Sequence, residues 1–209
     1  MTSRNVVKLF FSTLLIGGFV TSVTGFIVRW GEFSPYFKNI ELLSIISTFF
    51  WLFCFGFIFS LVSQVAFFAY LTVHRFGLSI FRSFWNRVQV VLIVFALFDL
   101  VYFRYRAFAE NGESLLPYLY PALLILAVGL VAAYYKAKQT NKKAFIPALF
   151  FMTVVTIVEW VPVLRINDQN WVYLMIFPLL ACNIYQLLIL HKLHESSIRE
   201  RSAKVENPA

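Results

Sequence analysis

The sequence predicts an all-α fold: a polytopic membrane helix bundle of about six transmembrane helices, with both termini in the cytoplasm. The 209 residues are 60% apolar and only 13% charged, which is about half the charged share of a soluble domain. The apolar residues form blocks of span length that are separated by short charged segments. Basic residues are concentrated in every second one of these segments. Together these observations predict one multi-pass protein of the cytoplasmic membrane.

The individual spans follow from apolar blocks close to the ~20 residues that a helix needs to cross ~30 Å of hydrocarbon. The second block carries no charge over residues 42–73. At ~1.5 Å per residue it is too long for one upright crossing, so its helix should tilt or lie partly along the interface. No Ala-x-Ala pattern follows the first block, which predicts an uncleaved span. The six predicted spans are 9–28, a stretch within 42–73, about 88–103, 115–135, 144–164 and 171–190.

The orientation follows from the Lys and Arg residues between the spans. The N-terminus, residues 75–87, residues 136–143 and the tail hold 13 of them, and the opposite side holds five. An excess of Lys and Arg marks the cytoplasmic side. We therefore predict a transmembrane domain over 1–190 and a short charged cytoplasmic tail over 191–209, expected to be disordered.

Small residues recur every four positions in the first span, at Thr13, Gly17, Thr21 and Gly25. Such a stripe lets two helix backbones approach closely. Close packing inside the bundle is the interpretation we favour, and homodimerisation is the alternative. The sequence does not predict the oligomeric state.

Two acidic residues, Asp99 and Glu159, lie inside predicted spans. Each precedes an arginine by five or six residues, which places both about 7–9 Å below the outer charged boundary. A charge at that depth is costly unless it is paired or hydrated, so both should face the bundle interior. Their candidate partners are arginines near the same boundary: Arg29, Arg104, Arg106 and Arg165.

This predicted polar cluster has two interpretations. It is either a set of structural ion pairs between helix ends or a proton- or ligand-responsive site near the outer face. A second polar layer lies nearer the cytoplasm, and interhelical hydrogen bonds are its simplest explanation. Its members are Gln64, Gln89, Asn183 and Gln186.

The basic segments 74–87 and 136–143 predict contacts with membrane lipids or with a cytoplasmic protein. The net charge of +8 is explained by this topology, so no nucleic-acid partner is expected. The sequence lacks G-x-S-x-G, H-E-x-x-H and glycine-rich phosphate-binding motifs. Cys54 and Cys182 lie in apolar blocks, away from every histidine. We therefore expect no catalytic residue, no metal and no cofactor.

Four stretches resemble the KinB-signalling pathway activation (KbaA) family of endospore-forming bacteria. They are TGFIVRWGEF at 24–33, FAYLTVHRFG at 68–77, KQTNK at 138–142 and VEWVPV at 158–163. The resemblance extends to about residue 191 and includes no catalytic motif. It implies a small multi-pass membrane protein needed for signalling by the membrane histidine kinase KinB, upstream of the phosphorelay that starts sporulation.

The leading hypothesis is a non-enzymatic accessory of a sensor histidine kinase pathway. Its partner would be a KinB-like kinase or the lipoprotein associated with that kinase. Asp99, Glu159 and Arg29 would form the responsive cluster, and segments 74–87 and 136–143 the docking surfaces. The main alternative is a small proton-coupled transporter or channel that uses Asp99 and Glu159. A further alternative is an intramembrane enzyme, which would need a pocket of converging polar groups.

Overall fold

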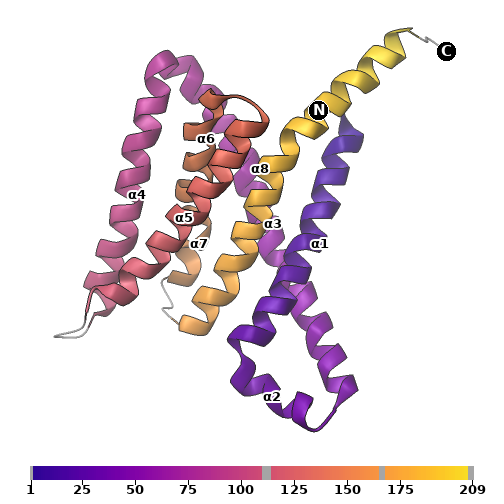
Figure 1. Cartoon of the computed structure of the whole chain (residues 1–209), viewed down its shortest axis with the longest axis vertical. Coiled ribbons are helices and arrows are strands. Elements are labelled where there is room, and N and C mark those ends of the chain that lie inside the picture. Colours follow the sequence, from indigo (N-terminus) through magenta and orange to yellow (C-terminus); the bar gives the residue numbers. More distant parts are fainter. Residues whose placement is uncertain (1, 110–113, 165–167, 207–209) are drawn as a thin grey trace.

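A computed structural model describes residues 2–109, 114–164 and 168–206, and these residues form helices joined by short turns. No strand occurs in these ranges, so the all-α prediction is confirmed. Figure 1 shows the long helices packed side by side in a bundle, with the short helix α2 at one end. The elements are α1 (Ser3–Val28), α2 (Trp30–Lys38), α3 (Leu42–Phe81), η1 (Arg82–Phe84), α4 (Trp85–Phe108), α5 (Leu116–Gln139), η2 (Lys142–Ala144), α6 (Phe145–Phe150), η3 (Phe151–Val155), α7 (Thr156–Leu164) and α8 (Gln169–Glu206).

Five helical stretches of the described chain are long and apolar enough to cross a membrane. One of them, Leu42–Phe108, contains both α3 and α4. The chain reverses between these two helices (Figure 1), at Arg82, whose φ is 48°. The segments that the sequence predicted as spans overlap α1, α3, α4, α5, the α6–η3–α7 segment and α8.

Helix α3 is longer than the sequence pattern indicated. It continues through the predicted cytoplasmic segment as far as Phe81, and its 40 residues extend for about 60 Å. The corner after it is held by Trp85, whose indole N–H donates to Nδ1 of His74 at 3.0 Å. The Trp85 ring also lies directly on Gly77, where a Cβ would overlap it. Segment 74–87 thus consists of the end of α3, the short helix η1 and the start of α4.

Helix α8 continues into the predicted tail as far as Glu206. The helix begins after Asp168, whose carboxylate accepts a hydrogen bond from the Asn170 backbone N–H at 2.8 Å. Residues 191–206 contain no glycine or proline. They also have a partner in the N-terminus of α1: the Asn5 side-chain amide donates to Ser197 Oγ at 2.8 Å.

The small-residue stripe of α1 packs inside the bundle, as we favoured. All four of its residues are buried, and the stripe faces α3. A Cβ built on Gly56 of α3 would lie only 2.6 Å from the carbonyl oxygen of Gly17. The two backbones are therefore almost in contact, which only glycine permits at this crossing.

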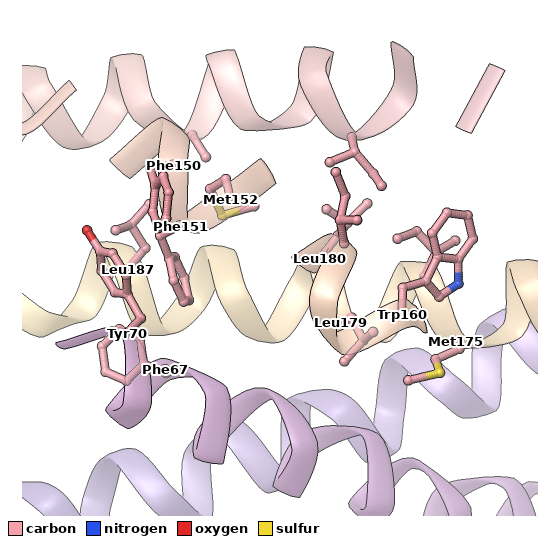
Figure 2. Close-up of a cluster of buried hydrophobic side chains, with 14 of the residues drawn as sticks. Phe67, Tyr70, Phe150, Phe151, Met152, Trp160, Met175, Leu179, Leu180 and Leu187 are labelled. Carbon is pink, nitrogen blue, oxygen red and sulfur yellow. The ribbon is translucent and has the colours of Figure 1, made fainter. Parts of the chain in front are cut away.

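Aromatic side chains fill the core between α3 and the α6–η3–α7 segment. Figure 2 shows Phe67 and Tyr70 pointing toward Phe150 and Phe151. The Phe67 and Phe151 ring centroids are 5.4 Å apart, and those of Tyr70 and Phe151 are 5.0 Å apart. The Tyr70 hydroxyl donates to the Pro147 carbonyl at 2.8 Å. The π-helical turn η3 places Phe151, Met152 and Thr153 side by side in this buried layer.

The outward surface of the bundle is apolar. Ile27, Val65 and Leu116, on three different helices, are each 70% exposed. Large exposed apolar areas of this kind mark surfaces that contact lipid or another protein.

Candidate functional site

A buried hydrogen-bond network centred on Asn183 joins three helices. The Asn183 amide nitrogen donates to Thr156 Oγ1 at 2.9 Å and to Glu159 Oε2 at 2.8 Å, both on α7. The Asn183 amide oxygen accepts from Ser63 Oγ of α3 at 2.7 Å. Both donors and the acceptor of this amide are therefore used. One side chain of α8 fixes the positions of α3 and α7 relative to each other.

The network continues along α8 by one turn. Gln186 Nε2 donates to Ser63 Oγ at 2.6 Å and to the Cys182 carbonyl at 3.3 Å. On the other side of Cys182, Ser60 Oγ donates to the Thr13 carbonyl of α1 at 3.2 Å. Polar contacts thus extend through the centre of the bundle from α7 to α1. We call Ser63, Thr156, Glu159, Asn183 and Gln186 the central network.

Glu159 is buried, as its depth and charge predicted, with 4% of its surface exposed. We proposed arginines as its partners, whereas the structure gives it the amide of Asn183. Its second carboxyl oxygen, Oε1, has no hydrogen-bond partner among the described residues. The carboxyl is therefore held by a neutral donor in an apolar interior, an environment in which its ionised form is poorly compensated.

Asp99 lies elsewhere, half-buried on α4 in a cavity of about 740 Å³ between α4 and α7. Most of the side chains around it are apolar, with Phe103 and Val158 among them, and Arg104 also lines the cavity. The described residues give Asp99 no hydrogen bond or ion pair. Glu159 does not line this cavity. We call it the outer groove, because it lies toward the predicted outer ends of α4 and α7.

The predicted arginines occupy separate places. The Arg29 guanidinium lies 4.8 Å from the Trp171 ring centroid and 3.7 Å from the Glu32 carboxylate. The Arg104 guanidinium lies 5.7 Å from the Tyr118 ring centroid. Arg165 lies outside the described residues. The structure thus brings Asp99 and Arg104 into one groove, and places Glu159 on the opposite side of α7.

The predicted second polar layer is partly in the central network. Asn183 and Gln186 are members, but Gln64 has no hydrogen-bond partner for either amide atom among the described residues. Ser63 and Thr156 were not predicted, because a single hydroxyl residue in an apolar span carries little signal. The useful signal for Ser63 was its position next to Gln64, which marks a polar turn of α3.

The hydrogen bonds of the central network connect helices and do not form a recognisable binding site. In the described ranges, no three His, Cys, Asp or Glu side chains lie together in a way that could hold a metal ion. The central network instead sets the register of α3, α7 and α8. Breaking one of its hydrogen bonds would leave a buried polar group unpaired, so these helices have one strongly preferred arrangement.

Comparison with known proteins identifies a family. The KbaA family, described as KinB-signalling pathway activation in sporulation, matches residues 17–193. The KinB-signaling pathway activation protein of Bacillus subtilis (strain 168) is 48% identical over 194 residues, which cover 92% of this chain and 98% of that protein. No solved structure gives a significant match.

Proposed function

The chain belongs to the KbaA family of KinB-signalling pathway activation proteins, and from this membership we propose that it is a non-enzymatic integral membrane accessory of a sensor histidine kinase. The observation that carries the proposal is the 48% identity to the Bacillus subtilis protein over nearly the whole of both chains. Its pathway is sporulation signalling. The partner we propose is a KinB-like kinase or its associated lipoprotein.

In this proposal the bundle crosses the cytoplasmic membrane six times. The N-terminus, the α3–α4 corner, the α5–α6 turn and the end of α8 all lie at one end of the bundle (Figure 1). These are the segments that hold 13 of the 18 Lys and Arg residues, and such an excess belongs on the cytoplasmic side. The apolar outward surface supports placement of the bundle in the membrane.

The outer groove is the contact surface that we propose for a transmembrane helix of the partner. A half-buried carboxyl such as Asp99 is costly inside a bilayer unless it meets a polar or basic group. The surrounding apolar walls fit the side chains of a packed helix. A partner helix that carries a polar or basic residue would fill the groove and supply that group.

Proton-coupled transport is less well supported by this geometry. A transport path needs its acids along one continuous polar passage. Asp99 lines the outer groove, whereas Glu159 points away from it into the central network. The two acids therefore do not share a cavity among the described residues.

Complementation tests the pathway assignment. We expect this chain to restore spore formation in a Bacillus subtilis strain that lacks its own 48%-identical relative. The restored sporulation should depend on KinB. Expression of this chain should therefore have no effect in a strain that also lacks KinB. Failure to complement, despite normal amounts of the protein in membranes, would contradict the proposal.

Photocrosslinking tests the contact surface. Phe103 lines the outer groove, Phe98 of the same helix does not, and both are 60% exposed. A photoreactive phenylalanine at position 103 should crosslink to the kinase or its lipoprotein in native membranes, whereas the same group at 98 should crosslink mainly to lipid. Equal crosslinking to the kinase from both positions would remove the groove as the specific surface.

A further inference from the structure

A second cavity, of about 560 Å³, lies where α1, α3, α5 and α8 meet at the end of the bundle that holds the N-terminus. Four basic or titratable side chains line it: Arg75 of α3, Lys136 of α5, and His191 and His194 of α8. No acidic residue is among its lining residues. We call it the basic pocket. The basic pocket shares no lining residue with the outer groove, and no residue of the central network lines it.

The polar side of the basic pocket has unused hydrogen-bond donors. Lys136 is only 8% exposed, and its ammonium donates one hydrogen bond, to the Leu187 carbonyl at 2.7 Å. An ammonium has three N–H groups, so the described residues leave two of them for a ligand. Nδ1 of His191 is also buried and has no hydrogen-bond partner among the described residues. A buried ammonium with a single neutral acceptor is costly without a counter-charge.

The other side of the basic pocket is apolar. Its walls include Val6, Phe68, Leu71 and Leu190. A small soluble anion would leave these side chains without a partner. A molecule that joins a negative head to a hydrocarbon chain would satisfy both sides of the pocket.

We propose that the basic pocket binds an anionic phospholipid, whose phosphate meets Arg75 and Lys136 and whose acyl chain lies along Phe68 and Leu71. Basic pockets between helices on the cytoplasmic side are known binding sites for anionic lipid headgroups. Arginine binds phosphate oxygens in pairs, and lysine adds a compact charge. This inference concerns a lipid site, and it stands whether or not a kinase binds the outer groove.

Native mass spectrometry of the purified full-length protein tests the proposal. The probe is phosphatidylglycerol, compared with phosphatidylcholine of the same acyl chains. We expect the protein to retain phosphatidylglycerol preferentially. Arg75→Gln and Lys136→Gln should each weaken this binding about fivefold, the change expected for one Lys or Arg near an anionic headgroup.

Two control variants make the comparison specific. Lys138→Gln removes a cation two residues along α5 that is exposed and does not line the pocket. Arg87→Gln removes an exposed arginine from α4, near the same end of the bundle. Both variants should bind phosphatidylglycerol like the wild type. Arg75 is itself exposed, so Arg75→Gln keeps the test valid even if Lys136→Gln does not fold.

Three results would overturn the proposal. The first is equal retention of phosphatidylcholine and phosphatidylglycerol. The second is unchanged phosphatidylglycerol binding in Arg75→Gln. The third is displacement of the lipid by inorganic phosphate or glycerol phosphate at similar concentration, which would assign the basic pocket to a soluble phosphate compound.

Discussion

The Asn183 side-chain amide connects α8 to α3 and α7. It uses two donors and one acceptor on three different residues. Interhelical hydrogen bonds in membranes contribute on the order of 1 kcal/mol each. The larger effect is the cost of leaving the partners buried and unpaired when the amide is removed.

We predict that Asn183→Leu lowers the stability of the protein by about 1–3 kcal/mol, because it leaves Glu159, Thr156 and Ser63 without a shared partner. Gln64→Leu is the matched control. Gln64 is also a buried amide, and its two polar atoms have no partner in the described part of the chain, so its replacement should be neutral or stabilising. Thermal unfolding in detergent distinguishes the two, and equal Tm losses would show that the central network does not stabilise the fold.

The sequence predicted which polar residues are buried, but not which of them pair. Glu159, Asn183 and Gln186 stand out because they interrupt apolar spans. Their pairing depends on which helices are neighbours, and helical periodicity gives only the face and the depth of a residue. For that reason Asn183 as the partner of Glu159, rather than an arginine, could be learned only from the structure.

At the scale of the helices, each apolar segment of the sequence overlaps a helix, but several helices end elsewhere than predicted. The prediction placed helix ends where charged or polar residues begin, but α3 and α8 both continue past those residues. Tertiary contacts explain the difference. Trp85 packs on Gly77 at the end of α3, and Asn5 binds Ser197 near the end of α8. Packing contacts of this kind stabilise helical turns that local composition does not favour.

The α1–α3 crossing gives a prediction at the same scale. Gly56→Ala should destabilise the protein by about 1–3 kcal/mol, because the new methyl group would meet the Gly17 backbone, which cannot move aside as a side chain can. Gly31→Ala is the control, since a Cβ there has no neighbour within 4 Å. Melting temperatures in detergent should fall only for Gly56→Ala. A stable Gly56→Ala protein would mean that α1 and α3 are not in close contact.

At the scale of the whole molecule, the fold class could be read from composition, because a chain this apolar has few alternatives to a helix bundle in lipid. The prediction of which end of the bundle faces the cytoplasm rests on the counts of Lys and Arg alone. Neither the basic pocket nor the outer groove was predicted, because each is assembled from helices that are distant in sequence.

The proposed topology predicts which loops reagents can reach. In a variant with Cys54→Ser and Cys182→Ala, a cysteine in place of Lys38 should react with a membrane-impermeant maleimide in intact bacterial cells. A cysteine in place of Lys142 should react only after permeabilisation. Both lysines are exposed in the structure, so accessibility differs by membrane side alone. Labelling of position 142 in intact cells would contradict the six-crossing arrangement.

The unbroken course of α8 has a mechanical consequence. Asn183, in the middle of the bundle, and Ser197, beside the first residues of α1, lie on one helix with no glycine or proline between them, about 21 Å apart along its axis. A continuous helix of this kind is a rigid element that can carry coupling between two sites. A twist of α8 that pulled Asn183 off Glu159 would also swing Ser197 away from Asn5. The helix therefore links the hydrogen bonds in the middle of the bundle to those at the start of the chain.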